Sequence, residues 1–160
     1  MTEVNISCVI QVFDNLDELD PDVKDLMQNA IAARDMAYAP YSNFKVGAAL
    51  LLDNGEVISG SNQENASYPS GLCAERTVIY YAGAKYPKSK FLRMAITAAS
   101  KKGTTLEPIP PCGACRQAIV EYEIKQHKPI ELYFMGASGK VMKSNSVANL
   151  LPLVFDKSVL

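Results

Sequence analysis

The chain has 160 residues, a formal net charge of −1 and one histidine, and these values exclude several kinds of protein. A nearly neutral chain lacks the basic face that binding to nucleic acid usually requires. A single histidine excludes any metal site that needs two histidines from one chain. Four cysteines are too few for a disulfide scaffold of this length and are typical of a reducing compartment. If the protein binds a transition metal, sulfur must therefore supply most of the ligands.

The length predicts a single domain over residues 1–160, because no linker rich in Pro, Gly or Ser divides the chain. The first residues lack the cationic and apolar segments of a signal peptide. The longest uninterrupted apolar stretch, around residues 46–52, is far shorter than a membrane span. We therefore expect a cytoplasmic protein with no membrane partner.

The first two expected elements are a strand and a helix. Residues 4–13 alternate apolar and polar side chains, which predicts a strand that buries Cys8. Asp20 and Pro21 are typical of a helix start, so a helix is expected from there to about Tyr38.

The rest of the chain alternates strands with helices. Asp53-Asn54-Gly55 is a strong hairpin signal between two apolar runs. The expected elements are strands at 44–52, 56–60, 91–99 and 130–135, a short strand after 139, and helices at 73–85, 113–126 and 147–151. Because strands and helices alternate in the second half, helices should cover both faces of a partly parallel sheet. We expect an α/β fold, a three-layer α-β-α sandwich around a mixed, roughly five-stranded sheet.

A Cys-x-x-Cys pair, Cys112 and Cys115, follows two prolines at an expected helix start. The spacing brings both sulfurs to the same side of the first turn, and a helix N-terminus stabilises the thiolate form. In a cytosolic α/β chain, such a pair alone fits a metal site and a redox pair of the thioredoxin type equally well.

A third cysteine favours the metal site. Cys73 also lies where a loop enters an expected helix, and Glu75 follows two residues later. If the two helix starts converge, three thiolates can hold a zinc ion and leave the fourth position open for water, which is typical of catalytic zinc. Glu75 cannot easily bind the same ion as Cys73, but it can reach the water and move its proton. The residues thus predict one Zn²⁺ per subunit and Glu75 as the catalytic acid and base.

The expected site also needs a cation. Three thiolates around Zn²⁺ leave a net negative charge, which weakens the metal as a Lewis acid, so a cationic side chain should donate to a sulfur. Arg76 and Arg116 each adjoin a proposed site residue. Arg76 is the better candidate because its turn also carries Cys73 and Glu75.

The runs Cys73-Ala-Glu75-Arg and Pro111-Cys112-Gly-Ala-Cys115-Arg-Gln match the three-cysteine form of the zinc nucleobase and nucleoside deaminase signature. More specifically, the chain resembles the small, homotetrameric cytidine deaminases over almost its whole length. Three further segments carry this resemblance: Tyr41-Ser-Asn-Phe44-Lys-Val-Gly47-Ala-Ala-Leu, Asn62-Gln-Glu64-Asn-Ala-Ser-Tyr68 and Leu150-Leu-Pro-Leu-Val-Phe155. The resemblance implies that Cys73, Cys112 and Cys115 bind zinc and that Glu75 transfers the proton, which are the roles already predicted for these residues.

The resemblance adds a set of substrate contacts. It implies that Asn62 and Glu64 hold the 3′-hydroxyl region of a ribose and that Phe44 packs against the pyrimidine. The backbone near Ala74 would meet the carbonyl edge of the base. Phe155 would reach into the site of a neighbouring subunit, so the resemblance implies a homotetramer with shared sites.

Three features depart from the pattern of the family. Pro110 stands where relatives often have serine, and Leu153-Val154 is bulkier than the usual small residues before the aromatic residue. Residues 1–20 extend beyond the typical start, and no function is assigned to them. His127 is expected at an exposed helix end and not at the metal.

The expected reaction is hydrolytic deamination of cytidine and 2′-deoxycytidine to the uridine products and ammonia. A deaminase for blasticidin S would share the zinc motifs but not the Asn62-x-Glu64-Asn-Ala element. A polynucleotide-editing deaminase is disfavoured by the net charge of −1, so no nucleic-acid partner is expected. A zinc-stapled structural module would need a fourth protein ligand, and Cys8 and His127 lie in unpromising contexts.

Overall fold

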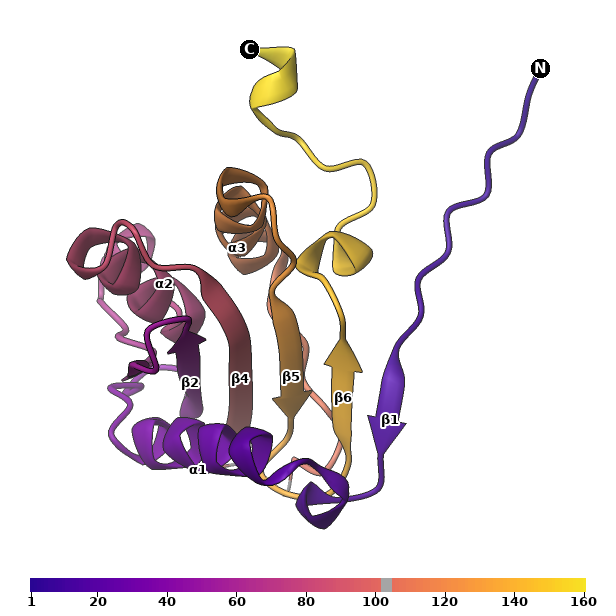
Figure 1. The fold of residues 1–160 in the computed structure, drawn as a ribbon. Coiled ribbons are helices and arrows are strands. Elements are labelled where there is room, and N and C mark those ends of the chain that lie inside the picture. Colours follow the sequence, from indigo (N-terminus) through magenta and orange to yellow (C-terminus); the bar gives the residue numbers. More distant parts are fainter. Residues whose placement is uncertain (102–104) are drawn as a thin grey trace.

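A mixed sheet forms the middle of the molecule in the computed structural model, which describes residues 1–101 and 105–160 (Figure 1). Its strand order is β1-β6-β5-β4-β2-β3. The strands are β1 (Gln11–Phe13), β2 (Phe44–Leu52), β3 (Val57–Ser61), β4 (Phe91–Ser100), β5 (Glu131–Met135) and β6 (Val141–Ser144). β4 and β5 run parallel, whereas the other neighbouring strands are antiparallel. The partly parallel sheet predicted from the sequence is confirmed.

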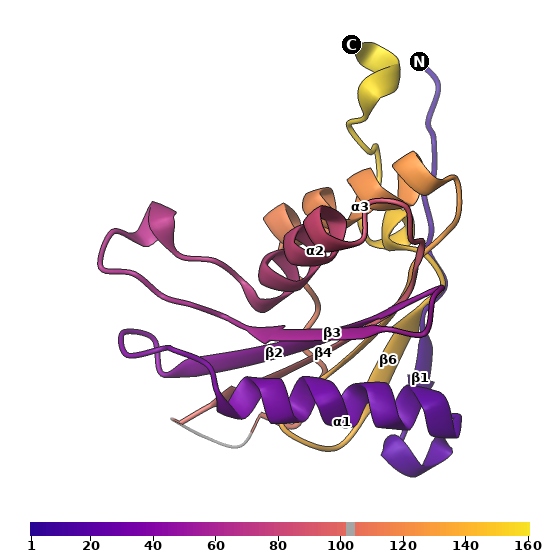
Figure 2. The ribbon, with the colours of Figure 1, turned by 60° about the vertical axis from the view of Figure 1, so that its left-hand side comes forward.

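Helices cover both faces of this sheet. The helix α1 (Pro21–Asp35) lies on one face, and α2 (Ala74–Lys85) and α3 (Gly113–Gln126) lie side by side on the other (Figure 2). The three-layer α-β-α sandwich is therefore confirmed. The sheet has six strands in the described residues, where roughly five were expected, and β1 is the shortest of them.

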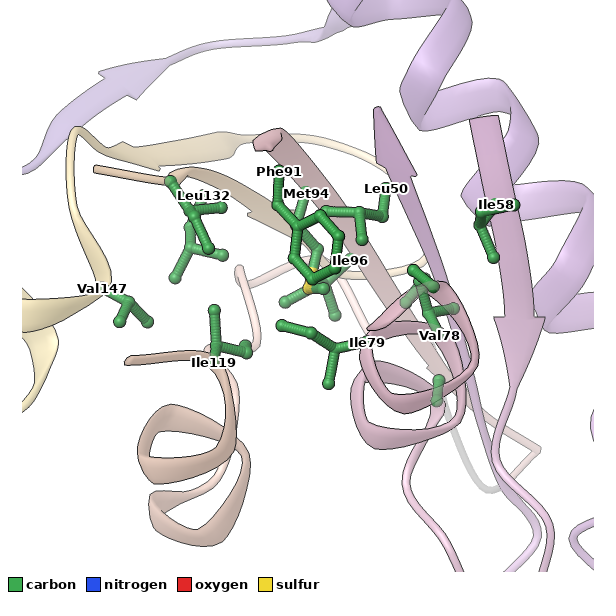
Figure 3. Packing of buried hydrophobic residues seen from close by; sticks show 14 of the residues in the cluster. Leu50, Ile58, Val78, Ile79, Phe91, Met94, Ile96, Ile119, Leu132 and Val147 are labelled. Carbon is green, nitrogen blue, oxygen red and sulfur yellow. The ribbon is translucent and has the colours of Figure 1, made fainter. Parts of the chain in front are cut away.

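Strand alternation divides the core into two halves. In β2 and β4, Leu50 and Ile96 face α2 and α3, whereas their neighbours Ala49 and Ala95 face α1. Ile79 of α2 lies against the first half, beside Leu50, Phe91 and Met94 (Figure 3). Each fully buried aliphatic side chain contributes about 1.5–3 kcal/mol. This packing fixes α2 and α3 on the sheet, and with them the two helix starts that carry the cysteines.

The helix α1 approaches β2 at Gly47. A Cβ atom at Gly47 would overlap the carbonyl oxygen of Ala30 and the backbone nitrogen of Arg34. Only glycine fits between the two backbones at this point. The contact holds the beginning of β2, where Phe44 lies.

The N-terminal strand is shorter than predicted. Only Gln11–Phe13 pair with β6, and Cys8 is exposed, so the expected burial of Cys8 is wrong. The physical reason is the length of β6: Gln11 lies opposite Lys143, and β6 ends one residue later at Ser144. In the described part of the chain, residues before 10 therefore have no strand beside them.

Two helix boundaries also differ from the predictions. The helix α1 ends at Asp35 and not at Tyr38, because Tyr38 exchanges backbone hydrogen bonds with the segment at residues 62–64. The expected helix at 147–151 is a 3₁₀ turn, η3 (Val147–Leu150), whose first backbone groups are capped by Ser146. Within residues 1–101 and 105–160, no helix combines the length and the apolar character that a membrane crossing needs.

Candidate active site

The two helix starts that carry the cysteines converge. Cys73 is the N-cap residue of α2, and Cys112 is the N-cap residue of α3, with Cys115 in the first turn of α3. The three Sγ atoms lie within 4.8 Å of one another, and those of Cys112 and Cys115 are 3.5 Å apart. The structure thus brings together the three predicted ligands, which lie up to 42 positions apart in the sequence (115 − 73).

The sulfur cluster fits a zinc ion that keeps one open position. Three sulfurs this close can each approach one ion to the usual Zn–S distance of about 2.3 Å, and helix N-termini favour the thiolate form. His127 caps the opposite end of α3, and Cys8 is exposed in the segment before β1. Neither His127 nor Cys8 can therefore supply a fourth zinc ligand, so these two residues do not form the closed four-ligand site of a structural zinc module.

Arg76 lies against the sulfur cluster. Its Nη2 donates to Cys73 Sγ at 3.6 Å, and its Nε is buried with no hydrogen-bond partner in the described residues. Hydrogen bonds from the Cys115 thiol and from Arg76 lower the pKa of Cys73 to about 5, despite partial burial. The pKa of Cys115 is raised, because its thiol donates to Cys73 and is itself buried. The geometry agrees with the cation expected beside the sulfurs.

Arg116 has different partners. Its Nε donates to the carbonyl oxygen of Pro111 at 2.8 Å, and its Nη1 donates to that of Leu150 at 2.8 Å. Arg116 therefore joins the loop before α3 to the end of η3. Its guanidinium supports the backbone that presents Cys112, and its recorded bonds go to carbonyl oxygens rather than to sulfur.

Glu75 lies in the first turn of α2 and is 5% exposed. Burial raises the pKa of its carboxyl above the ordinary value, with a smaller rise from the neighbouring Cys73. A carboxyl group whose pKa is shifted toward neutrality can both accept and return a proton. The location and the pKa suit an acid–base residue.

A cavity of about 300 Å³ opens beside the cluster. Cys73, Cys112 and Glu75 line it together with three residues that the resemblance assigned to substrate. The whole lining comprises Ser42, Phe44, Val46, Asn62, Glu64, Cys73, Glu75, Ile96, Ala98, Ile109, Pro110 and Cys112. A neighbouring opening of about 410 Å³ shares Asn62, Glu64 and Cys73 and continues toward Tyr41 and Tyr68.

Several lining residues were not singled out from the sequence. Ile96 and Ala98 alternate along β4, so strand periodicity places both on the α2 and α3 face, but it gives no sign of a cavity there. Ser42 lies within a segment that carries the family resemblance. Ile109 belongs to the loop before Cys112, where no periodic pattern exists to place it.

Asn62 and Glu64 also stabilise the cavity wall. The Asn62 side chain accepts from the backbone of Val46 at 2.8 Å and donates to the carbonyl of Phe44 at 3.0 Å. Glu64 accepts from the backbone nitrogen of Tyr41 at 2.9 Å and from the backbone and hydroxyl of Ser42. An amide and a carboxylate each have further hydrogen-bonding capacity for a ligand.

Two predicted substrate residues lie outside the lining of this cavity. Phe155 is 61% exposed, and its carbonyl oxygen accepts from Gln117 Nε2 at 3.0 Å. Ala74 is fully buried as the first residue of α2. The assigned roles of both residues stay predictions.

The fold and the site together define a class: a three-layer α/β protein with a three-cysteine metal group and a buried carboxyl group beside a cavity. Residues 21–128 match the family model described as the cytidine and deoxycytidylate deaminase zinc-binding region. The chain therefore belongs to this zinc-binding deaminase family.

Individual relatives agree with this assignment. A cytidine deaminase of Halalkalibacterium halodurans is 42% identical over 81% of this chain and 91% of the relative, and one of Sporosarcina psychrophila is 39% identical over 85% and 93%. The crystal structure of cytidine deaminase from Burkholderia pseudomallei matches with a TM-score of 0.70 and 40% identity. That match covers 86% of this chain and 100% of the other.

Proposed function

We propose that the protein hydrolyses cytidine and 2′-deoxycytidine to uridine and 2′-deoxyuridine with release of ammonia. The observation that carries this proposal is a cluster of three cysteine sulfurs, two of whose residues, Cys73 and Cys112, line one cavity together with the buried Glu75. The names of the relatives supply the substrate class.

The cavity has the character that a nucleoside requires. Phe44, Val46 and Ile96 offer an apolar wall for a pyrimidine ring. Asn62 and Glu64 line both the inner cavity and the wider outer opening, which suits contacts with ribose hydroxyls. In this arrangement the amino group of the base points toward the cysteines.

Cys73, Cys112 and Cys115 are the proposed zinc ligands, and zinc supplies Lewis-acid activation of water when it is bound. Glu75 accepts a proton from the attacking water, as a C4–O bond forms on the base. Glu75 then donates this proton to N3. It next takes the remaining proton from the new hydroxyl group on C4 and gives it to the amino group, as the C4–N bond breaks and the C4 oxygen becomes the carbonyl of the product. Water is consumed and ammonia leaves, so Glu75 ends in its starting protonation state.

We also propose a homotetramer in which Phe155 contributes to the site of a neighbouring subunit. The exposure of Phe155 and its absence from the cavity lining of its own chain support this role. Light scattering of the purified protein tests the tetramer, and a monomer with full activity would contradict it. A cytoplasmic location is proposed from the four free cysteines.

The proposed reaction is tested by measuring ultraviolet absorbance changes with cytidine, deoxycytidine, free cytosine and blasticidin S side by side. We expect turnover of both nucleosides, loss of turnover after zinc removal, and recovery when zinc returns. Exclusive turnover of blasticidin S would favour the alternative deaminase. A zinc-loaded protein that turns over none of the four compounds would contradict a deaminase for these substrates.

A further inference from the structure

Residues 4–13, here called the arm, begin as a segment that projects from the body of the molecule and end in β1 at the edge of the sheet (Figure 1). They are extended, and their even-numbered side chains are apolar: Val4, Ile6, Cys8, Ile10 and Val12. Val4 is 80% exposed and Ile6 is 55% exposed. An uncovered apolar stripe of this kind on a strand invites pairing with another strand.

The arm is the outer edge of the sheet. β1 pairs with β6 on one side, and no strand of residues 1–101 and 105–160 pairs with its other side. Phe13 packs into the core beneath α1, so alternation turns the even-numbered residues toward the opposite face. Residues 4–9 extend beyond the end of β6 by about 20 Å, at roughly 3.3 Å per residue. The backbone groups of the arm are thus available along most of its length.

The order of side chains in the apolar stripe is the same from either end: Val-Ile-Cys-Ile-Val, with Cys8 at the centre. If two arms pair antiparallel about Cys8, Val4 lies opposite Val12 of the second copy, and Ile6 lies opposite Ile10 of the second copy. No charged residue occurs between Glu3 and Asp14, so no like charges oppose each other within this pair.

We propose that the arms of two copies of this chain pair as antiparallel strands centred on Cys8 and continue the sheet from one copy into the other. Such a contact is isologous: the two copies are related by a two-fold axis, so if one residue of the first copy contacts a given residue of the second, the reverse contact also forms. The arm precedes residues 21–128, which match the deaminase family, and it lies apart from the cavity. The inference is therefore independent of the proposed reaction.

The register is tested by crosslinking the full, zinc-loaded protein at Cys8 under mild oxidation, with mass spectrometry to locate the disulfide. Directly opposite cysteines on an antiparallel pair have Cα separations that a disulfide can span. In a Cys8→Ser background, Ser7→Cys and Val9→Cys provide matched positions that do not face themselves. We expect Cys8 to crosslink between copies at least tenfold faster than either. Equal rates at the three positions, or no crosslink at Cys8, would overturn the register.

A charge exchange tests the pairing itself. In Ile6→Asp/Ile10→Asp, the proposed register places carboxylates opposite each other, and we expect the Cys8 crosslinking rate to fall at least tenfold. In Ile6→Lys/Ile10→Asp, the same two positions carry opposite charges, and we expect crosslinking to recover. Equal rates for the two double variants would contradict the pairing. The circular dichroism spectrum and the zinc content should match those of the wild type in both variants, which shows that each has folded.

Discussion

The starts of α2 and α3 both present cysteine to the same cavity, yet they are supported in different ways. At α2, Arg76 donates directly to the sulfur of Cys73, and the Cys115 thiol together with Arg76 lowers the pKa of Cys73. At α3, Arg116 reaches only the carbonyl oxygens of Pro111 and Leu150 among its recorded partners. Each arginine lies in the first turns of a helix that begins at a cysteine, three residues after Cys73 for Arg76 and four residues after Cys112 for Arg116. Their contacts predict different roles: Arg76 would offset the negative charge of the sulfurs, whereas Arg116 would position the backbone before α3.

The largest expected effect comes from removing a sulfur. Cys115→Ser should lower zinc content and reduce kcat/KM by more than about 100-fold. Removal of a direct zinc ligand weakens metal binding more than removal of a residue that only hydrogen-bonds to a ligand. Zinc content by elemental analysis and nucleoside turnover check this prediction. Cys8→Ser is the matched control, since Cys8 lies in the arm, and it should retain both properties. Full zinc content in Cys115→Ser would contradict the ligand assignment.

Arg76→Gln should reduce zinc affinity or turnover by about 10- to 100-fold, with the free energy of unfolding of the zinc-free protein nearly unchanged. The glutamine keeps a hydrogen-bond donor but removes the positive charge beside Cys73. Arg76→Lys restores a charge without the planar guanidinium, so it should recover part of the loss. Competition with a zinc chelator and steady-state kinetics measure the two effects. Wild-type values for both in Arg76→Gln would exclude a role for this charge.

Arg116→Gln should act mainly on stability. Loss of the two hydrogen bonds from a charged donor lowers the free energy of unfolding by about 2 kcal/mol. Urea denaturation followed by circular dichroism measures this change. Zinc affinity should fall less than in Arg76→Gln, because no sulfur loses a direct donor. If Arg116→Gln loses zinc as strongly as Arg76→Gln and unfolds like the wild type, the distinction between the two arginines is wrong.

Local patterns predicted most of the fold and the metal group. The Asp53-Asn54-Gly55 turn, the buried strand at Phe91 and the helix after Cys112 depend on neighbours in the sequence, and the structure confirms each. The sequence also predicted a zinc site on the condition that Cys73 and the Cys112–Cys115 pair converge, because three thiolates beside a carboxyl group are typical of catalytic zinc. The structure shows that the three sulfurs do converge.

The remaining features depend on contacts between distant segments. Alternation in residues 4–13 indicated a strand, but the end of β6 at Ser144 limits the pairing to three residues. The Arg116 contact with Leu150 requires the path of a loop that has no periodic signal. Similarly, Asn62 was expected to face substrate, and its bonds to the backbone of Phe44 and Val46 follow from the β2 and β3 pairing.

The most direct test of the central claim is Glu75→Gln, measured for zinc content and cytidine turnover in the same preparation. The amide has nearly the same shape as the carboxyl but cannot carry the proton between water, N3 and the leaving amine. The account predicts full zinc content with turnover reduced by at least about 100-fold, as expected for the loss of a general acid and base. Turnover close to that of the wild type in the zinc-loaded variant would contradict the assignment of Glu75.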